Sequence, residues 1–203
     1  MKKLLVLAIF TFAMAGLTSA QINPALRPPK GAQIAIVVFE DLECPSCGNA
    51  EPLLMQAVAT AKVPLVRHDF PIPSHAWSFD AHVIARYFDT HSPALGEEFR
   101  HWVLGIQFTI TKANLRGTAE RFATEHKIEL PADVDPKGEL AGKVRADFEA
   151  GKAIGVYQTP SIYVVSNKQT GLPFAQVGSL PELLKTVEQM KKDMEAEAAA
   201  KKK

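Results

Sequence analysis

The sequence predicts an α/β domain with a central mixed sheet, interrupted by an all-helical insertion. Three observations carry this prediction: two strand-like runs enclose a helical pattern, a long stretch of helical periodicity follows, and strand character returns near the C-terminus. The 203 residues suffice for one domain with an insertion. With 47% hydrophobic and 22% charged residues, the composition is that of a folded globular chain.

The N-terminus has the pattern of an export signal. Two lysines precede an apolar run over residues 4–12, and small residues occupy positions 18–20. The run is too short to span a bilayer comfortably, which takes about 20 residues. We expect residues 1–20 to be a signal peptide cleaved after Ala20, with an uncleaved anchor as the alternative.

Charge and cysteine content exclude several classes of protein. The chain has 23 basic and 22 acidic residues, a net charge of +1, so charge alone indicates no nucleic-acid partner. Its two cysteines exclude a disulfide-rich scaffold and any four-cysteine metal or iron–sulfur site.

The first elements form a strand–helix–strand unit. Residues 21–33 contain three prolines and are expected to form an extended arm. Residues 34–39 are an apolar, β-rich run, typical of a strand buried on both faces. Apolar residues then recur at helical spacing over 47–61, and 63–70 is a second strand. Such a unit predicts a parallel pair of strands.

Residues 75–154 are predicted to form the helical insertion. Apolar periodicity indicates four helices, near residues 76–89, 94–104, 112–126 and 138–153. The insertion would therefore separate the sheet-forming parts of the chain.

Strand character returns at 161–165 and at 174–177, a spacing that predicts a hairpin, and a last helix follows. Residues 34–74 and 155–195 would together form the sheet-containing domain. Residues 196–203 are expected to be a flexible charged tail, with lysine contact to a membrane surface as the alternative.

Two cysteines three positions apart lie between the first strand and the first helix. Cys44 sits where the unpaired N–H groups and the dipole of a helix stabilise a thiolate. Cys47 lies one turn further along, within reach for a small, reversible disulfide ring. Pro45 suits the first turn, because its missing N–H would have had no partner there. This arrangement predicts thiol–disulfide exchange.

A static disulfide and half of a zinc site are other uses of such a pair. Zinc needs two more ligands, and none of the six histidines lies near the cysteines in sequence or has paired-ligand spacing. We expect surface or partly buried histidines and no metal. A ring across four residues constrains little of the unfolded chain, which argues against a purely stabilising disulfide. The redox-active disulfide itself would be the only redox group.

Three stretches resemble the DsbA-like thiol–disulfide oxidoreductases of the thioredoxin superfamily. Residues 38–47, with Pro52 beyond them, resemble the active-site strand and kinked helix of that family. Residues 67–73 resemble the strand that leads into its helical insertion, and residues 152–164 resemble its return segment. The resemblance covers about residues 31–190 and implies a thioredoxin fold, βαβ followed by ββα, with an inserted helical subdomain.

The resemblance also implies residue roles. Cys44 would be the attacking nucleophile and Cys47 the resolving thiol. Pro160 would be a cis-proline that faces the cysteines, where an ordinary trans proline at a strand start is the alternative. Thr159 would present its backbone to an extended substrate.

One departure from the family concerns a buried acid. Many thioredoxin-fold proteins carry an acid six residues before the first cysteine, where this chain has Val38. Glu40 lies two residues on, on the same strand face, and is the candidate for proton transfer. A solvated Glu40 is the alternative.

The predicted function is that of an exported, monomeric protein-disulfide oxidoreductase in the periplasm. It would donate its disulfide to reduced or unfolded exported proteins, and a quinone-linked membrane thiol oxidase would re-oxidise it. A reductase or isomerase on the same fold is the nearest alternative. A non-catalytic module that binds metal or peptide through the thiols is the other.

The active-site loop departs from the family as well. The dipeptide Pro45-Ser46 lacks the histidine of typical DsbA proteins, whose positive charge favours the thiolate. Three acidic residues, Glu40, Asp41 and Glu43, place negative charge nearby and disfavour it. We therefore expect a weaker oxidant than typical DsbA.

Replacing Ser46 by histidine should lower the pKa of the Cys44 thiol and raise the reduction potential. A stabilised thiolate stabilises the reduced form, and an effect on the order of 1 kcal/mol corresponds to roughly 20 mV for a two-electron couple. Thiolate absorbance against pH and equilibration with glutathione measure the two quantities. If Ser46→His leaves both unchanged, charge in the dipeptide does not set the potential.

Overall fold

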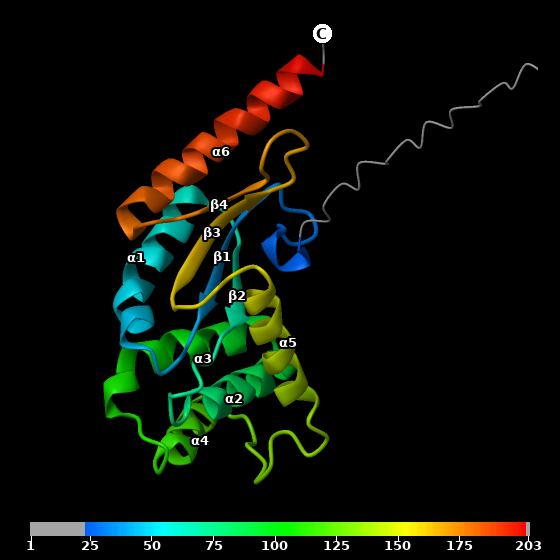
Figure 1. Cartoon of the computed structure of the whole chain (residues 1–203). Helices are drawn as coiled ribbons and strands as arrows, with labels where there is room; N and C mark the ends of the chain where they lie inside the picture. The colour runs from blue at the N-terminus through cyan, green and yellow to red at the C-terminus, as the bar shows by residue number, and fades with distance from the viewer. Residues whose placement is uncertain (1–22, 202–203) are drawn as a thin grey trace, which may run out of the picture.

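A computed structural model describes residues 23–201, so the predicted signal peptide lies outside the described residues. Its sheet has the strand order β2-β1-β3-β4 (Figure 1). The strands are β1 (Ile34–Glu40), β2 (Leu65–Asp69), β3 (Ser161–Ser166) and β4 (Phe174–Gln176). β1 pairs parallel with β2 and antiparallel with β3, and β3 pairs antiparallel with β4. The predicted mixed sheet is confirmed.

Helices cover both faces of this sheet and one end of it (Figure 1). They are α1 (Pro45–Ala61), α2 (Ser78–His91), α3 (Pro93–Ile106), α4 (Leu115–Glu125), α5 (Glu139–Ala153) and α6 (Leu180–Ala200), with short 3₁₀ turns η1 (Pro24–Leu26) and η2 (Gln107–Thr109). α1 and α6 pack on one face, while α5 and η1 pack on the other. α2, α3 and α4 form the inserted helical region. In residues 23–201, no helix combines the length and apolarity needed to cross a membrane.

β1 is the centre of the fold, because every one of its seven residues is buried. Ile36 and Val38 face α1 and α6, whereas Val37 and Phe39 face the opposite layer. Full burial of each such side chain contributes about 1.5–3 kcal/mol. The position of the following cysteine is therefore set by a strand that packs on both sides.

The inserted helices have a core of their own, built on aromatic rings. Phe88 of α2, Phe99 of α3 and Phe122 of α4 meet with ring centroids 4.8–5.1 Å apart. These ring contacts hold the three helices together. The three helices lie at one end of the sheet (Figure 1).

α5 belongs to both parts of the molecule, although the sequence placed it wholly in the insertion. Val144 packs against Val83 of α2. Phe148 packs against Phe70 at 4.7 Å and joins the layer beneath Phe39. One helix therefore joins the insertion to the sheet.

The ends of the chain differ from expectation. The predicted extended arm contains η1, where the Asn23 side chain accepts the Ala25 N–H at 2.9 Å and Leu26 is buried against the sheet. The tail predicted to be flexible from residue 196 is helical to Ala200, as part of α6. Alanine, glutamate and lysine favour helix, and the Glu197 carboxylate accepts a backbone N–H of the loop before β4.

Substituting two glycines of α5 should have opposite effects on stability. A Cβ on Gly151 would lie 2.7 Å from the Phe70 ring and 2.9 Å from the Phe39 ring, whereas one on Gly142 meets nothing within 4 Å. Gly151→Ala should destabilise the fold by about 1–3 kcal/mol through overpacking. Gly142→Ala should stabilise it by roughly 0.5–1 kcal/mol through helix propensity. Urea unfolding measures both, and a Gly151→Ala midpoint at or above that of Gly142→Ala would contradict the packing of α5 on the sheet.

Candidate active site

The two cysteines open α1 at the end of the buried strand β1. Cys44 is the N-cap residue with extended backbone, and Pro45 follows at the first helical position. The Cys47 N–H donates to the Cys44 carbonyl at 3.0 Å. Both residues are buried free thiols, while Pro45 and Ser46 between them are exposed. The sulfur atoms therefore lie just below an exposed dipeptide.

The two thiols have opposite acidities. A hydrogen bond from the Cys47 thiol is the largest cause that lowers the pKa of Cys44 to about 5. The Thr159 side chain and the N–H groups of Cys47 and Ser46 add to this effect, against burial, which opposes it. Burial, followed by the hydrogen bond to Cys44, raises the pKa of Cys47 far above its ordinary value. At neutral pH the pair is one thiolate beside one thiol.

The loop before β3 meets the cysteines from the other side. The carbonyl oxygen of Thr159 lies 3.5 Å from the Cys44 sulfur. The Thr159–Pro160 peptide bond is cis. Residues 115 positions apart in the chain thus lie together at the site.

Glu40 is buried and not solvated. Its Oε2 lies 2.5 Å from the Arg67 guanidinium, which also binds Glu51 at 2.7 Å and Glu97 at 2.8 Å. Among residues 23–201, Glu40 Oε1 has no hydrogen-bond partner. Burial raises the pKa of Glu40, although Arg67 lowers it, and the Glu40 charge raises the pKa of Cys47.

Asp41 and Glu43 bind backbone N–H groups. The buried Asp41 carboxylate accepts from the N–H of Ile72 at 2.6 Å and of Glu43 at 2.7 Å, and it contacts His75 Nδ1 at 2.7 Å. Glu43 Oε2 accepts from the N–H groups of Trp77 and Ser78 at 2.7 and 3.0 Å, at the N-terminus of α2.

Other groups offset the negative charge of these three acids near Cys44, and the expected weaker oxidising strength stays a prediction. The Glu40 carboxylate is balanced by Arg67, and the other two are balanced by N–H groups and a helix start. The pKa of Cys44 is lowered in their presence. Asp41 and Glu43 fasten the active-site loop through these hydrogen bonds.

A family model described as Thioredoxin matches residues 29–179. The chain belongs to the thioredoxin family.

Solved structures agree with this assignment in fold. The thiol-disulfide exchange protein α-DsbA2 of Wolbachia pipientis superimposes with a TM-score of 0.65 at 16% identity, over 81% of this chain and 85% of that chain. A periplasmic thioredoxin-like protein of Salmonella enterica serovar Typhimurium gives a TM-score of 0.62 at 18% identity, over 80% and 87% of the two chains. The predicted DsbA-like thioredoxin fold is confirmed.

A curated relative is longer than this chain. The chain is 26% identical over 155 residues to Na(+)/H(+) antiporter NhaA 3 of Salinispora tropica. The match covers 72% of this chain and 22% of that protein. The likeness therefore concerns one part of the antiporter sequence.

Sequence reasoning missed two residues of this thioredoxin-family site. Arg67 gathers the carboxylates of three separate elements, and no local pattern marks it. His82 was expected at the surface or partly buried, but its side chain is completely buried, with contacts to Asp69 and to the N–H of Leu42. An ionisable residue among apolar neighbours on one helical face was the available signal.

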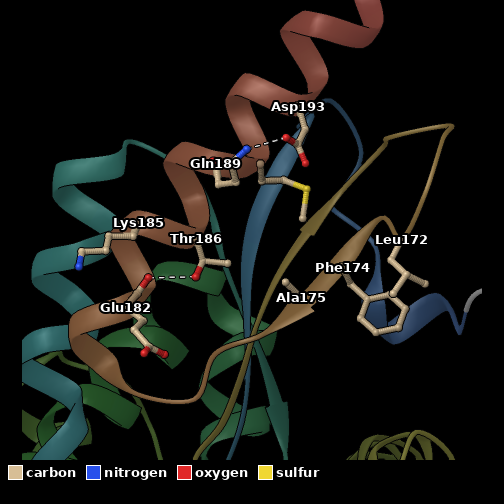
Figure 2. Close-up of a pocket in the computed structure, with 9 residues that line it drawn as sticks. Leu172, Phe174, Ala175, Glu182, Lys185, Thr186, Gln189 and Asp193 are labelled. Atoms are coloured by element: carbon tan, nitrogen blue, oxygen red, sulfur yellow. Dashed lines mark hydrogen bonds between the residues drawn. The ribbon is translucent and has the colours of Figure 1, made fainter.

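The structure holds a hollow away from the cysteines as well. A cavity of about 470 Å³ lies between β4 and α6, lined by Phe174, Ala175, Glu182, Gln189, Met190 and Asp193 among others (Figure 2). None of its lining residues comes from the cysteine segment or the Thr159 loop.

Within residues 23–201, no three or more His, Cys, Asp or Glu residues are grouped to hold a metal ion.

Cys44 should alkylate far faster than Cys47 in the reduced protein. Because the thiolate is the nucleophile, the Cys44 rate should rise with pH through about 5 and level off above it. Peptide mapping after brief iodoacetamide exposure at a series of pH values measures this. The lowered pKa also stabilises the reduced fold, fully above pH 9.0, and this contribution is lost as the pH falls through about 5. Equal labelling, or preference for Cys47, contradicts the assignment.

Proposed function

We propose that this thioredoxin-family protein is a thiol–disulfide oxidoreductase that oxidises reduced exported proteins in the periplasm. The observation that carries the proposal is the pairing of a Cys44 thiol of pKa about 5 with a buried Cys47 thiol of raised pKa. A thiol of low pKa is a good leaving group in disulfide exchange. Cys44 is thus suited to form a mixed disulfide and to leave it rapidly.

The proposed exchange has two steps. A substrate thiolate attacks the Cys44 sulfur of the oxidised protein, the Cys44–Cys47 bond breaks, and Cys47 leaves with the electron pair and takes up a proton. A second substrate thiolate then attacks the substrate sulfur of the mixed disulfide, and Cys44 leaves as a thiolate. The substrate dithiol loses two electrons, and the protein disulfide gains them.

Glu40 is the proposed proton donor to Cys47. It is the acid whose charge raises the pKa of Cys47, and burial raises its own pKa. Its Oε1 has no hydrogen-bond partner in residues 23–201. An acid of raised pKa can take up a proton at the oxygen that Arg67 does not bind and pass it to the leaving sulfur.

The substrate would bind beside the Thr159–Pro160 loop. The Thr159 carbonyl already lies 3.5 Å from Cys44, and Pro160 has no N–H to offer there. An extended substrate segment would pair with the Thr159 backbone in strand-like fashion. The protein would act as a monomer, and a quinone-linked membrane thiol oxidase would restore its disulfide.

Replacing Cys47 by alanine should trap the first step of the exchange. Without Cys47, the Cys44 thiolate should attack a mixed disulfide on an unfolded test protein, displace the small thiol and remain disulfide-bonded to the test protein. Non-reducing gels should show an adduct that reductant removes, and the matched Cys44→Ala variant should show none. An adduct with Cys44→Ala and not with Cys47→Ala reverses the roles.

The direction of exchange is tested by equilibration of the wild-type protein with glutathione. A stabilised Cys44 thiolate stabilises the reduced form, so the pair should be more oxidising than glutathione and should introduce disulfides into the reduced test protein. A potential below that of glutathione would make the protein a reductant. Failure of both thiols to exchange would remove the redox function altogether.

A further inference from the structure

The segment that carries Cys44 is a tight turn. The Cys44 N–H donates to the Asp41 carbonyl at 3.1 Å, so residues 41–44 form a β-turn with Leu42 and Glu43 at its centre. Leu42 is completely buried. A buried backbone N–H needs a partner, since leaving it unpaired costs as much as a lost hydrogen bond.

That partner is a histidine from the inserted helical region. The Leu42 N–H donates to Nε2 of His82 at 3.3 Å, across 40 residues of chain. On its other side, His82 Nδ1 lies 2.8 Å from Asp69 Oδ1. The imidazole therefore bridges the turn and the end of β2.

The two contacts determine where the imidazole proton lies. A backbone N–H only donates, so Nε2 must offer its lone pair and the proton must sit on Nδ1. The Nδ1–H then donates to the Asp69 carboxylate. Arg86 and Arg100, at 2.5 and 3.9 Å, balance the charge of that carboxylate. His82 is held as a neutral hydrogen-bond acceptor that faces the turn.

We propose that His82 is a positioning residue for Cys44, which acts by clamping the N–H of Leu42 in the turn. The inference rests on the proposed function, because its consequence is a property of the reactive thiolate. Hydrogen bonds to the Cys44 sulfur depend steeply on distance and angle. A turn that shifts by a fraction of an ångström weakens the bonds from Cys47 and from the start of α1.

Two conservative variants test the two hydrogen bonds of His82, to Leu42 and to Asp69, separately. In His82→Asn, the side-chain amide can still donate to Asp69, but it is too short to reach Leu42. In His82→Gln, the longer amide can offer its oxygen at the place of Nε2. His82→Asn should raise the pKa of Cys44 by about one unit, roughly the worth of one hydrogen bond to the thiolate. His82→Gln should restore much of the shift.

His68 supplies a matched control. It also joins an aspartate, Asp147 at 3.1 Å, and a backbone group, the Ala25 carbonyl at 3.3 Å, but it touches nothing in residues 41–44. His68→Asn should lower the urea midpoint while it leaves the Cys44 pKa unchanged. Thiolate absorbance against pH measures all three variants. An unchanged Cys44 pKa in His82→Asn, or an equal shift in His68→Asn, overturns the proposal.

The wild-type protein provides a test that does not depend on any variant. Nitrogen-15 chemical shifts of the His82 ring should show an unprotonated Nε2 and a protonated Nδ1 at neutral pH. A protonated Nε2 would overturn the clamp even where thiol exchange is intact. Loss of thiol exchange with the expected His82 signature would instead refute the proposed function alone.

Discussion

The hydrogen bonds around the Cys44 sulfur at the start of α1 are the constraint on which the rest of the site depends. They lower the pKa of one thiol, and the burial that lets them form raises the pKa of its neighbour. Both effects need Cys44 to stand where β1 ends and α1 begins. The sheet, the loop before β3 and the insertion each contribute a contact that keeps it there.

The acidic residues beside the cysteines illustrate how context changes the meaning of charge. In isolation, a carboxylate near a thiol disfavours the thiolate. Here the Asp41 carboxylate accepts the N–H of Ile72, and the Glu43 carboxylate accepts the N–H groups of Trp77 and Ser78. These bonds fasten the turn to the start of the inserted region. The active-site loop is thereby hydrogen-bonded to the start of the insertion.

Arg67 is a buried charge that binds the carboxylates of three separate elements. It joins Glu40 of β1, Glu51 of α1 and Glu97 of α3; the first two carboxylates are buried with Arg67, whereas Glu97 is partly exposed. In a buried ion pair, the cost of desolvating the charges can exceed the free energy gained from their attraction. Removing one partner nevertheless typically costs about 3–5 kcal/mol, because it leaves the other charge buried without a counter-charge. The cluster therefore ties the sheet, helix α1 and the insertion together, and it leaves one oxygen of Glu40 without a hydrogen-bond partner in residues 23–201.

Local pattern alone determined the cysteine pair between strand and helix, the buried run of β1 and most helices. Each of these follows from residues within one or two turns of each other, whose periodicity and termini have direct physical meaning. Only the tertiary structure decided the rest: the burial of His82, the partners of Arg67, and the double packing of α5. Those contacts join residues such as Leu42 and His82, 40 positions apart. No local period encodes such a pairing, because it arises only when separate elements compete to satisfy buried polar groups in one shared core.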